Sequence, residues 1–451
     1  MNLPTFWGGI HPPQKKDLTV NEKIVDYLPV GELVFPMAQN IGAPNQPLVK
    51  KGDAVLAGQK LGGNDAFVSA PILSSVSGTV KDVAPRMTSS GTEELCVIIE
   101  NDGKYEMDPS WTPLENYETT DPKEYLKRIR EAGIVGFGGA TFPTAVKLSP
   151  PPEKKIRYLI INAVECEPYL NCDNRLMLED PQKIVLGLKL LMRLFPDAEG
   201  IIAIENNKPE AAALMTSELA KLNAPKMSVK TLAVKYPQGA EKMLIEALTG
   251  QEYVMSALPA DVGCIILNVR TTHQIYEAIA LGKPAVSRIV TVTGETIVHP
   301  MNIRVPLGTS VRELIELCGG FKEQPAKILS GGPMMGMAQA SADFPVSIDI
   351  PVVKGTSGIL ALSADSAHLH EETACIRCGR CVAACPMGIM PHELNPLVLM
   401  RDYKTFEEKG GLNCIECGCC TYSCPANRHL TQSCRDGKAT IMEMRRKAAA
   451  K

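Results

Sequence analysis

Two stretches near the end of the chain decide how this part of the protein folds: CIRCGRCVAACP at residues 375–386 and CIECGCCTYSCP at residues 414–425. Both have the spacing C-x2-C-x2-C-x3-C-P, and nine of the 15 cysteines lie between Cys375 and Cys424. So many cysteines in a short secreted chain would indicate a disulfide scaffold. This chain is long, and its N-terminus lacks the apolar segment of a signal peptide. Cysteines clustered in this way in a reducing compartment indicate a bound metal.

The spacing of the two motifs predicts iron–sulfur clusters. Three cysteines separated by two residues can wrap one cluster, and the fourth points away and ligates the other cluster in two-cluster ferredoxins. We therefore predict two 4Fe-4S clusters, the first held by Cys375, Cys378, Cys381 and Cys424, and the second by Cys414, Cys417, Cys420 and Cys385. Zinc is the alternative, but zinc ribbons use paired C-x2–4-C knuckles, and two complete sets with a trailing proline fit iron–sulfur far better. Cys419 is predicted to be a bystander, and residues 392–410 to be helical.

Composition and charge narrow the class of protein. The chain has 451 residues, 45% of them hydrophobic and 22% charged, as in globular proteins of roughly two to four domains. Lys and Arg number 47 against 50 Asp and Glu, a net charge of -3. A protein that grips nucleic acid through its phosphates usually has a basic excess, so no nucleic-acid partner is predicted.

No apolar run in the sequence approaches the roughly 18 residues that cross a bilayer. The most apolar helical stretch, residues 183–195, is interrupted by Lys189 and Arg193 and is predicted to be an amphipathic core helix. We expect a cytoplasmic chain without a transmembrane segment. If it works at a membrane, it does so as a peripheral protein docked onto partners.

The pattern of elements predicts a multidomain α/β plus β protein with four regions. Residues 1–110 contain short β-branched runs broken by glycines, and their two half-motifs resemble the barrel-sandwich hybrid of biotinyl and lipoyl domains. The hairpin tip at residues 63–66 has no lysine to modify, so a structural role is predicted. Residues 111–285 alternate helices, such as 122–133, with strands, such as 156–165, as a layered α/β domain does. Residues 286–350 have the composition of a β-grasp module, and residues 351–451 comprise a linker and the helical cysteine-rich domain.

A glycine-rich loop, GFGGATFPTAVK, occupies residues 136–147. Glycines also serve ordinary turns, so the loop alone is a weak signal. The dinucleotide-binding fingerprint requires a strand before the loop, and here a helix precedes it. The dinucleotide interpretation therefore fails on context.

The loop does resemble G-R-G-G-A-G-F-P-T-G-x-K-W of the flavin- and NADH-binding subunit of respiratory complex I. The segment YLIINAVECEPY at residues 158–169, followed by Asp173-Asn174-Arg175, resembles a second stretch of that family. That subunit has one cluster motif, whereas this chain has two. GGIHPPQKK at residues 8–16, LPADVGCIILNVRTTHQIYEAI at 258–279 and SGGPMMG at 330–336 are similar to the RnfC subunit of Rnf complexes, and this resemblance spans essentially the whole chain.

The resemblance implies a complex I-type FMN-binding α/β domain, a β-grasp (SLBB) domain and a two-cluster ferredoxin-like domain. It implies that FMN and NAD(H) are held by residues in the matching stretches: Gly136, Gly138, Gly139, Lys147, Asn162, Glu165, Glu167, Lys235, Gly239, Glu241, Asn268, Thr271 and Thr272. Glycine amides and a lysine at such a loop could bind a flavin phosphate. Lys235, Gly239 and Glu241 occupy the place of the loop that helps receive nicotinamide. The chain departs from the complex I pattern at Phe137, Thr141, Leu148 and Val164, and these departures bear on the nicotinamide contacts more than on the phosphate contacts.

The function implied is that of a peripheral, NAD(H)-reacting subunit of a membrane-bound ferredoxin:NAD oxidoreductase that couples electron transfer to ion translocation. Nicotinamide exchanges two electrons as hydride and a cluster exchanges one, and FMN can do both. The implied partners are integral-membrane and peripheral subunits and, indirectly, ferredoxin. We expect no acid–base triad and no nucleophilic cysteine. Two alternatives stay open: a soluble flavin protein resembling cobalamin reductase, and a flavin-free electron-relay subunit.

Overall fold

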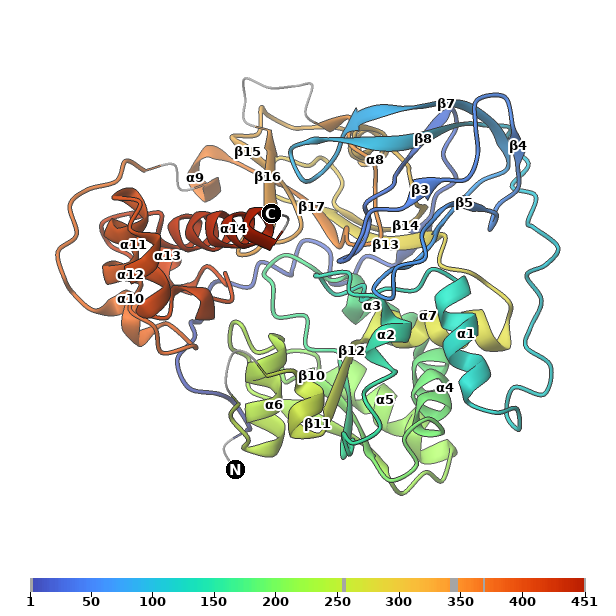
Figure 1. Ribbon diagram of the computed structural model, residues 1–451, viewed down its shortest axis with the longest axis horizontal. Coiled ribbons are helices and arrows are strands. Elements are labelled where there is room, and N and C mark those ends of the chain that lie inside the picture. The colour runs from blue at the N-terminus through green and yellow to red at the C-terminus, as the bar shows by residue number, and fades with distance from the viewer. Residues whose placement is uncertain (1–2, 254–256, 341–347, 368–369, 450–451) are drawn as a thin grey trace.

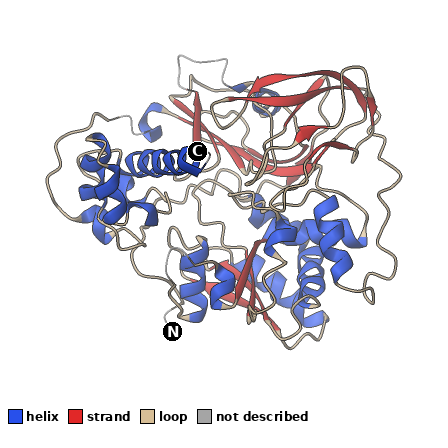
Figure 2. Cartoon of the chain, viewed as in Figure 1, coloured by secondary structure: helices blue, strands red, loops and turns tan. Residues whose placement is uncertain are grey.

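The computed structural model describes residues 3–253, 257–340, 348–367 and 370–449. Two β-rich parts lie together at one end, a layered α/β part lies below them, and a helical part stands to one side (Figures 1 and 2). This arrangement agrees with the multidomain class expected from the sequence. The domain boundaries at residues 110, 285 and 350 stay predictions.

The N-terminal β part consists of two small sheets. The first has the order β2-β8-β7-β4, with bounds Glu32–Pro36, Glu93–Asn101, Gly78–Met87 and Ala54–Val55. The second has the order β3-β5-β6, with bounds Gln46–Pro47, Lys60–Gly63 and Ile72–Leu73. Alternation along β2 buries Leu33 and Phe35 in the same apolar core as Val290 and Ile303 of the neighbouring sheet. The two β parts therefore pack as one body.

The α/β part is built on a parallel sheet of order β11-β10-β9-β12, with bounds Met227–Leu232, Glu199–Glu205, Tyr158–Asn162 and Cys264–Asn268. Its helices are α1 (Lys123–Glu131), α2 (Thr144–Lys147), α3 (Cys172–Glu179), α4 (Pro181–Met192), α5 (Pro209–Lys221), α6 (Glu241–Thr249), η1 (Pro259–Val262) and α7 (Val269–Ala280). Leu159 and Ile161 enter one core and Ile160 another, so apolar packing covers both faces of β9. The helices predicted at 122–133 and 183–195 are confirmed as α1 and α4.

The second β part is a six-stranded sheet of order β1-β14-β13-β17-β15-β16, with bounds Ile24–Asp26, Met301–Pro306, Ser287–Thr293, Gly358–Leu362, Lys327–Ser330 and Met337–Ala340. Helix α8 (Val311–Leu317) packs on it. Two of these strands lie outside residues 286–350, the range that the sequence predicts for the β-grasp module. β17 lies in the stretch expected to be a linker, and all five of its residues are buried between β13 and β15.

The helical C-terminal part carries the cysteine motifs. Its helices are α9 (Ala364–Ala367), α10 (Arg380–Ala383), α11 (Pro391–Leu399), α12 (Tyr403–Glu408), η3 (Gly411–Asn413), α13 (Cys419–Tyr422) and α14 (Leu430–Ala449). The helical stretch predicted at 392–410 is two helices, because Arg401, with φ +59°, ends the first. No helix in the described part of the chain is long and apolar enough to span a membrane.

Candidate cofactor sites

The two cysteine motifs fold into loops of the same backbone conformation. Arg377 and Glu416, each two residues after the first cysteine of its motif, have φ values of +55° and +58°. Gly379 and Gly418 follow two residues later with φ values of +73° and +84°, and each begins a short helix, α10 or α13. The amide of Arg377 donates to Cys375 Sγ at 3.5 Å, and the amide of Glu416 donates to Cys414 Sγ at 3.3 Å. The loop thus turns its backbone N–H groups towards sulfur.

Each loop lines its own cavity. One cavity is lined by Cys375, Cys378, Cys381 and Cys424, and the other by Cys385, Cys414, Cys417 and Cys420. In each case the fourth cysteine comes from the opposite motif, as the crossed spacing predicts. Four free thiols around one small cavity are the donor set that a 4Fe-4S cluster requires, so these residues fit the group. Their role as ligands is part of the proposal below.

The surroundings of the two cavities differ. Cys375 and Cys378 are exposed, whereas the four predicted ligands at the other cavity are all buried. Two further buried thiols, Cys419 and Cys434, line that second cavity. The sequence pattern gives neither of them a role. A hydrogen bond with the Cys434 thiol, aided by the amide of Glu416, lowers the pKa of Cys414 to about 7.

The parallel sheet of the α/β part defines a second candidate site. From β9 the chain continues to β10 and β11 on one side, whereas β12 joins β9 on the other side. In open α/β sheets, ligands bind beyond the carboxyl ends of the strands where the strand order reverses in this way. Asn162 ends β9, Asn268 ends β12, and the two are direct partners in the parallel ladder. Two predicted flavin-site residues therefore lie side by side at the position that the fold favours for a ligand.

The glycine loop lies against this edge. A Cβ on Gly138 would lie 2.9 Å from the Cβ of Asn268, so the loop approaches too closely for a side chain. A Cβ on Gly139, which has φ +149°, would meet no atom within 4 Å, and the loop's backbone is bare at this point. Thr271 Oγ1 accepts from the amide of Phe137 at 2.9 Å and fixes the loop to helix α7. A bare glycine backbone held at a strand edge fits a phosphate, because exposed amides can donate to its oxygens.

Asn162 and Asn268 both use their side chains within the site. Asn268 Oδ1 accepts from the amide of Arg270 at 2.9 Å and so caps helix α7, while Nδ2 donates to Asp173 Oδ2 at 2.7 Å. Asn162 Nδ2 donates to the carbonyl of Gly239 at 2.8 Å. Thr272 Oγ1 donates to the carbonyl of Asn268 inside α7 and serves the helix itself.

The predicted basic residues lie on different sides of this edge. Lys147 Nζ lies 2.5 Å from Glu241 Oε1 and 3.2 Å from the carbonyl of Ile266 on β12. The structure thus joins two predicted site residues, Lys147 and Glu241, in one ion pair. Lys235 Nζ instead donates to the carbonyl of Phe6 at 2.8 Å and stands 4.7 Å from the centroid of the Phe6 ring. It therefore faces the N-terminal segment.

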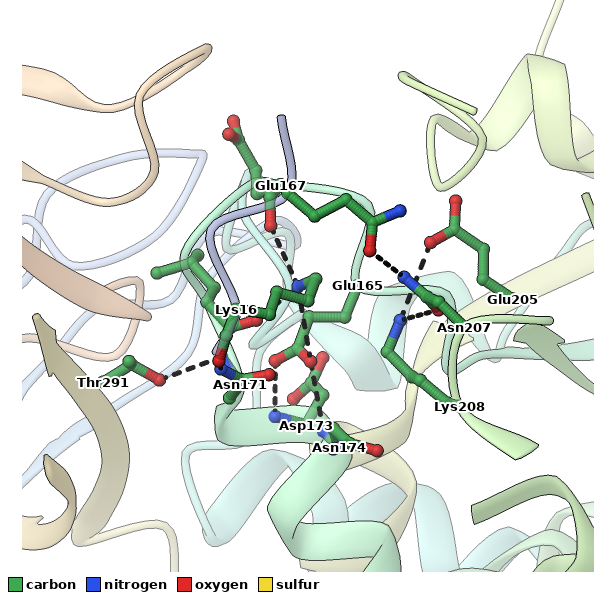
Figure 3. Close-up of polar contacts among 12 residues, drawn as sticks. Lys16, Glu165, Glu167, Asn171, Asp173, Asn174, Glu205, Asn207, Lys208 and Thr291 are labelled. Carbon is green, nitrogen blue, oxygen red and sulfur yellow. Dashed lines mark hydrogen bonds and ion pairs between the residues drawn. The ribbon is translucent and has the colours of Figure 1, made fainter. Parts of the chain in front are cut away.

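Glu165 lies in a buried cluster of charged and polar groups (Figure 3). Its carboxylate accepts from the amides of Asp173 at 2.7 Å and Asn174 at 3.2 Å, at the start of helix α3, and lies 3.9 Å from Lys16 Nζ. Burial raises the pKa of Glu165. Lys208, which pairs with Glu205 at 3.6 Å, is the second cation of this cluster. Glu165 therefore supports the start of α3 from within and lies next to Lys16.

Glu167 connects the α/β part to the second β part. Its carboxylate accepts from the amides of Met334 at 3.2 Å and Met335 at 2.9 Å, in the SGGPMMG stretch. Burial raises its pKa to about 7, against the lowering effect of these two amides. Glu167 therefore joins the two parts of the chain, a role that the sequence pattern does not indicate.

One departure from the complex I pattern has a structural explanation, and a second carries backbone strain. Phe137, which stands where that pattern has arginine, lies with its ring centroid 5.2 Å from the guanidinium of Arg288 and 5.8 Å from that of Arg270. Arg288 also donates to the Phe137 carbonyl at 2.5 Å, so two arginines from elsewhere in the chain flank this position. Thr141, which stands where the pattern has glycine, has φ +51°, a conformation that costs a β-branched residue about 1–2 kcal/mol.

Four family profiles match successive parts of the chain. They are the RnfC barrel sandwich hybrid domain at residues 4–104, the Nuo51 FMN-binding domain at 129–277, the SLBB domain at 289–338 and the 4Fe-4S dicluster domain at 374–429. The fold class expected from the sequence is confirmed. The FMN-binding and dicluster profiles together define a flavin- and iron–sulfur-dependent electron-transfer protein, and they support FMN and two 4Fe-4S clusters as its cofactors.

Curated relatives identify the family. The C subunit of the proton-translocating ferredoxin:NAD(+) oxidoreductase complex of Clostridium ljungdahlii is 45% identical over 91% of this chain and 88% of its own length. The C subunit of the Na(+)-translocating complex of Acetobacterium woodii is 43% identical over 98% of both chains. The corresponding subunit of the ion-translocating oxidoreductase complex of Rhodobacter capsulatus is 42% identical over 97% of this chain and 83% of its own. The chain belongs to the RnfC family of Rnf complex subunits, as the sequence resemblance predicted.

Among solved structures, a NAD+-reducing [NiFe]-hydrogenase in the H2-reduced state has a chain that is 19% identical, with a TM-score of 0.49. The match covers 74% of this chain and 65% of that one.

Proposed function

We propose that this chain is the NAD(H)-reacting subunit of a membrane-bound ferredoxin:NAD oxidoreductase complex that couples electron transfer to ion translocation. In this proposal it is a peripheral subunit at the cytoplasmic face of the membrane. FMN binds at the carboxyl edge of β9 and β12, which we call the flavin edge. The eight motif cysteines hold two 4Fe-4S clusters. Membership of the family, together with the flavin and dicluster profiles, supports this proposal.

One observation carries the proposal: a single short turn at residues 236–239, which we call the flavin-edge turn, contacts both candidate sites. The carbonyl of Gly239 accepts from Asn162 Nδ2 at the flavin edge. Three residues earlier, the Tyr236 hydroxyl donates to the carbonyl of Cys417 at 2.8 Å, at the buried cysteine cavity. With FMN at the strand edge and a cluster in that cavity, a site for two-electron chemistry and a site for one-electron chemistry would adjoin within one chain.

The residues of the flavin edge have separable tasks. Gly138 and Gly139 offer backbone amides to a phosphate, and Lys147, which contacts Glu241 and the carbonyl of Ile266 on β12, supplies a positive charge. Asn162 and Asn268 fix the strand ends that such a ligand would contact. The glutamates Glu165 and Glu167 hold α3 and the SGGPMMG stretch in place around the edge. Bound FMN would supply exchange between hydride and single electrons.

The cysteine loops supply the second set of tasks. Eight thiolates would hold the iron, and amides from the loop backbone would donate to their sulfurs, a contact that raises cluster potentials. The four predicted ligands of the second cavity are all buried, so a cluster held there would be shielded from water. The exposed Cys375 and Cys378 place the other cavity at the protein surface.

An anaerobic NADH titration tests the proposal. The full chain, reconstituted with iron, sulfide and FMN, is titrated with NADH while absorbance and low-temperature EPR are recorded. Bleaching of the flavin band followed by signals of reduced clusters is the expected result, and Lys147→Ala is expected to weaken flavin retention. Binding of about eight irons without flavin, and no response to NADH, would instead identify a flavin-free relay subunit.

A further inference from the structure

The N-terminal segment lies between the helical cysteine part and the α/β part. Figure 1 shows its dark-blue trace passing from the green α/β region, beside the red helices, to the β-rich end. We call residues 6–16 the N-terminal strap. They include GGIHPPQKK, one of the stretches that resemble the RnfC family.

The first half of the strap is hydrogen-bonded to the helical cysteine part and to the α/β part. The amide of Gly9 donates to the carbonyl of Ala384 at 3.0 Å, and Ala384 directly precedes Cys385 of the buried cavity. At the next residue, Ile10 exchanges two backbone hydrogen bonds with Tyr236, at 2.8 Å and 2.9 Å, as in an antiparallel bridge. Two adjacent strap residues thus bind a cysteine loop on one side and the flavin-edge turn on the other.

The second half of the strap is anchored to the predicted flavin-site segment. The carbonyl of Gln14 accepts from the amide of Tyr169 at 2.8 Å, and Lys16 Nζ donates to the carbonyl of Glu167 at 3.0 Å. The strap is therefore fixed at both ends.

The strap, the flavin-edge turn and the cysteine loops meet at one place, which we call the junction, and an apolar cluster fills it. Ile10, Tyr236, Ala384, Cys417 and Cys419 are buried together, and Cys166, Met334 and Ile415 pack against them. The strap, the flavin-edge turn, both cysteine motifs and the SGGPMMG stretch all contribute to it. Tyr236, which is almost fully buried, spans the junction: its backbone pairs with the strap and its hydroxyl reaches Cys417.

We propose that the N-terminal strap and Tyr236 are a positioning device that holds the cavity of Cys385, Cys414, Cys417 and Cys420 against the flavin-binding domain. The inference rests on the proposed function, because its purpose is to fix the two cofactor sites relative to each other. The glycines make this possible. A Cβ on Gly9, which has φ +78°, would lie 2.6 Å from the carbonyl oxygen of Tyr236, and one on Gly8 would lie 2.9 Å from that of Cys385. A side chain at either position would push the strap out of the junction.

The first test compares Gly9→Ala with Gly91→Ala in the reconstituted full chain. Gly91 has the same φ of +78°, but a Cβ there meets nothing within 4 Å, so this control carries the backbone strain without the collision. For Gly9→Ala we expect faster hydrogen exchange of the amides at residues 384–388. We also expect NADH to reduce the clusters about tenfold more slowly, with an unchanged rate of flavin reduction and an unchanged KM for NADH. Gly91→Ala is expected to match the wild type.

The second test needs no change of backbone. Tyr236→Phe removes the hydroxyl that reaches Cys417, and Tyr27→Phe, which removes a hydrogen bond of 2.6 Å to Glu313 far from the junction, is its control. We expect Tyr236→Phe alone to change the EPR line shape of one cluster and to slow cluster reduction, and its effect should not multiply with that of Gly9→Ala. Unchanged exchange, EPR and cluster reduction in both junction variants would overturn the inference. Hydrogen exchange reports on the strap even if NADH reduces nothing, so failure of the proposed function would be recognised separately.

Discussion

The contact between the glycine loop and Asn268 leads to a sharp prediction for Gly138→Ala. The new Cβ would lie 2.9 Å from the Cβ of Asn268, closer than real Cβ atoms approach other atoms in proteins, and 3.0 Å from its Nδ2. Either the loop or the asparagine must move. The matched control is Gly136→Ala, since a Cβ at Gly136 would meet its nearest neighbours only at 3.8 Å. Neither glycine has a positive φ, so the two variants differ only in the collision.

The magnitude follows from the bonds that Asn268 makes. Losing its cap on the amide of Arg270 costs about 1 kcal/mol. Losing its hydrogen bond to the Asp173 carboxylate costs about 1.5–3 kcal/mol. If Asn268 moves, Gly138→Ala should therefore lower the free energy of unfolding by about 2.5–4 kcal/mol. If the loop moves instead, the loss of one amide–phosphate bond should weaken FMN binding by about tenfold to 100-fold.

Two assays separate these outcomes. Urea unfolding of the apoprotein, followed by circular dichroism, measures the first, and quenching of FMN fluorescence measures the second. Gly136→Ala should stay close to the wild type in urea unfolding, because its Cβ has room. The double variant Gly138→Ala/Asn268→Gly should be no less stable than Asn268→Gly alone, because glycine removes the Cβ with which the new side chain collides. Equal behaviour of the two single glycine variants in both assays would refute the reasoning.

Three further predictions concern other parts of the site. Cys424→Ala should abolish the EPR signal that Cys375→Ala abolishes, and Cys385→Ala the other signal, as anaerobic reconstitution of the three variants can check; abolition of the same signal by Cys424→Ala and Cys385→Ala would contradict the crossed arrangement. The pKa of Glu167 is raised from 4.5 to about 7, so between these pH values the folded protein holds a proton on this carboxyl that the unfolded chain has lost. The free energy of unfolding should therefore fall as pH rises through this window, by up to about 3 kcal/mol. Glu167→Gln should flatten that slope in urea unfolding measured from pH 5 to pH 8, and an unchanged slope would rule out this group as its source. Thr141→Gly should raise the free energy of unfolding by roughly 0.5–1 kcal/mol, the relief of positive-φ strain less the entropy cost of glycine; a loss of stability would show that the threonine side chain contributes more than its strain costs.

Much of the cysteine site could be predicted from the sequence because its information is local. The spacing of the two motifs fixes which thiols can share a cluster, and the structure brings together the two sets of four that the spacing indicated. Spacing does not predict which buried residues outside the motifs line a cavity. Cys434 lies ten residues beyond the last motif cysteine, on helix α14, and only the packing of that helix brings it to the second cavity.

The flavin edge was predicted from motif resemblance, and here the structure divides the residues by task. Gly138, Asn162 and Asn268 meet at the strand ends. Glu165 and Glu167 are engaged with backbone amides of the protein, which no sequence pattern reveals, because the partners of Glu167 lie 167 and 168 residues away.

Long-range pairing also explains what the sequence interpretation missed in the fold. β17 lies in a stretch predicted to be a linker. Only its neighbours β13 and β15, which lie about 67 and about 30 residues earlier in the chain, make it a strand. The pairing of Ile10 with Tyr236 spans more than half of the chain and has no local signal. The strap is therefore visible only in the structure.

The central claim is that one chain joins two-electron and one-electron chemistry, and the most direct measurement is the electron capacity of the reconstituted protein. With FMN accepting two electrons and each cluster one, a reductive titration with dithionite should take up about four electrons per chain. NADH, added to a second sample, should populate the same flavin and cluster signals. An uptake of about two electrons confined to the clusters, with NADH changing no signal, would contradict the account.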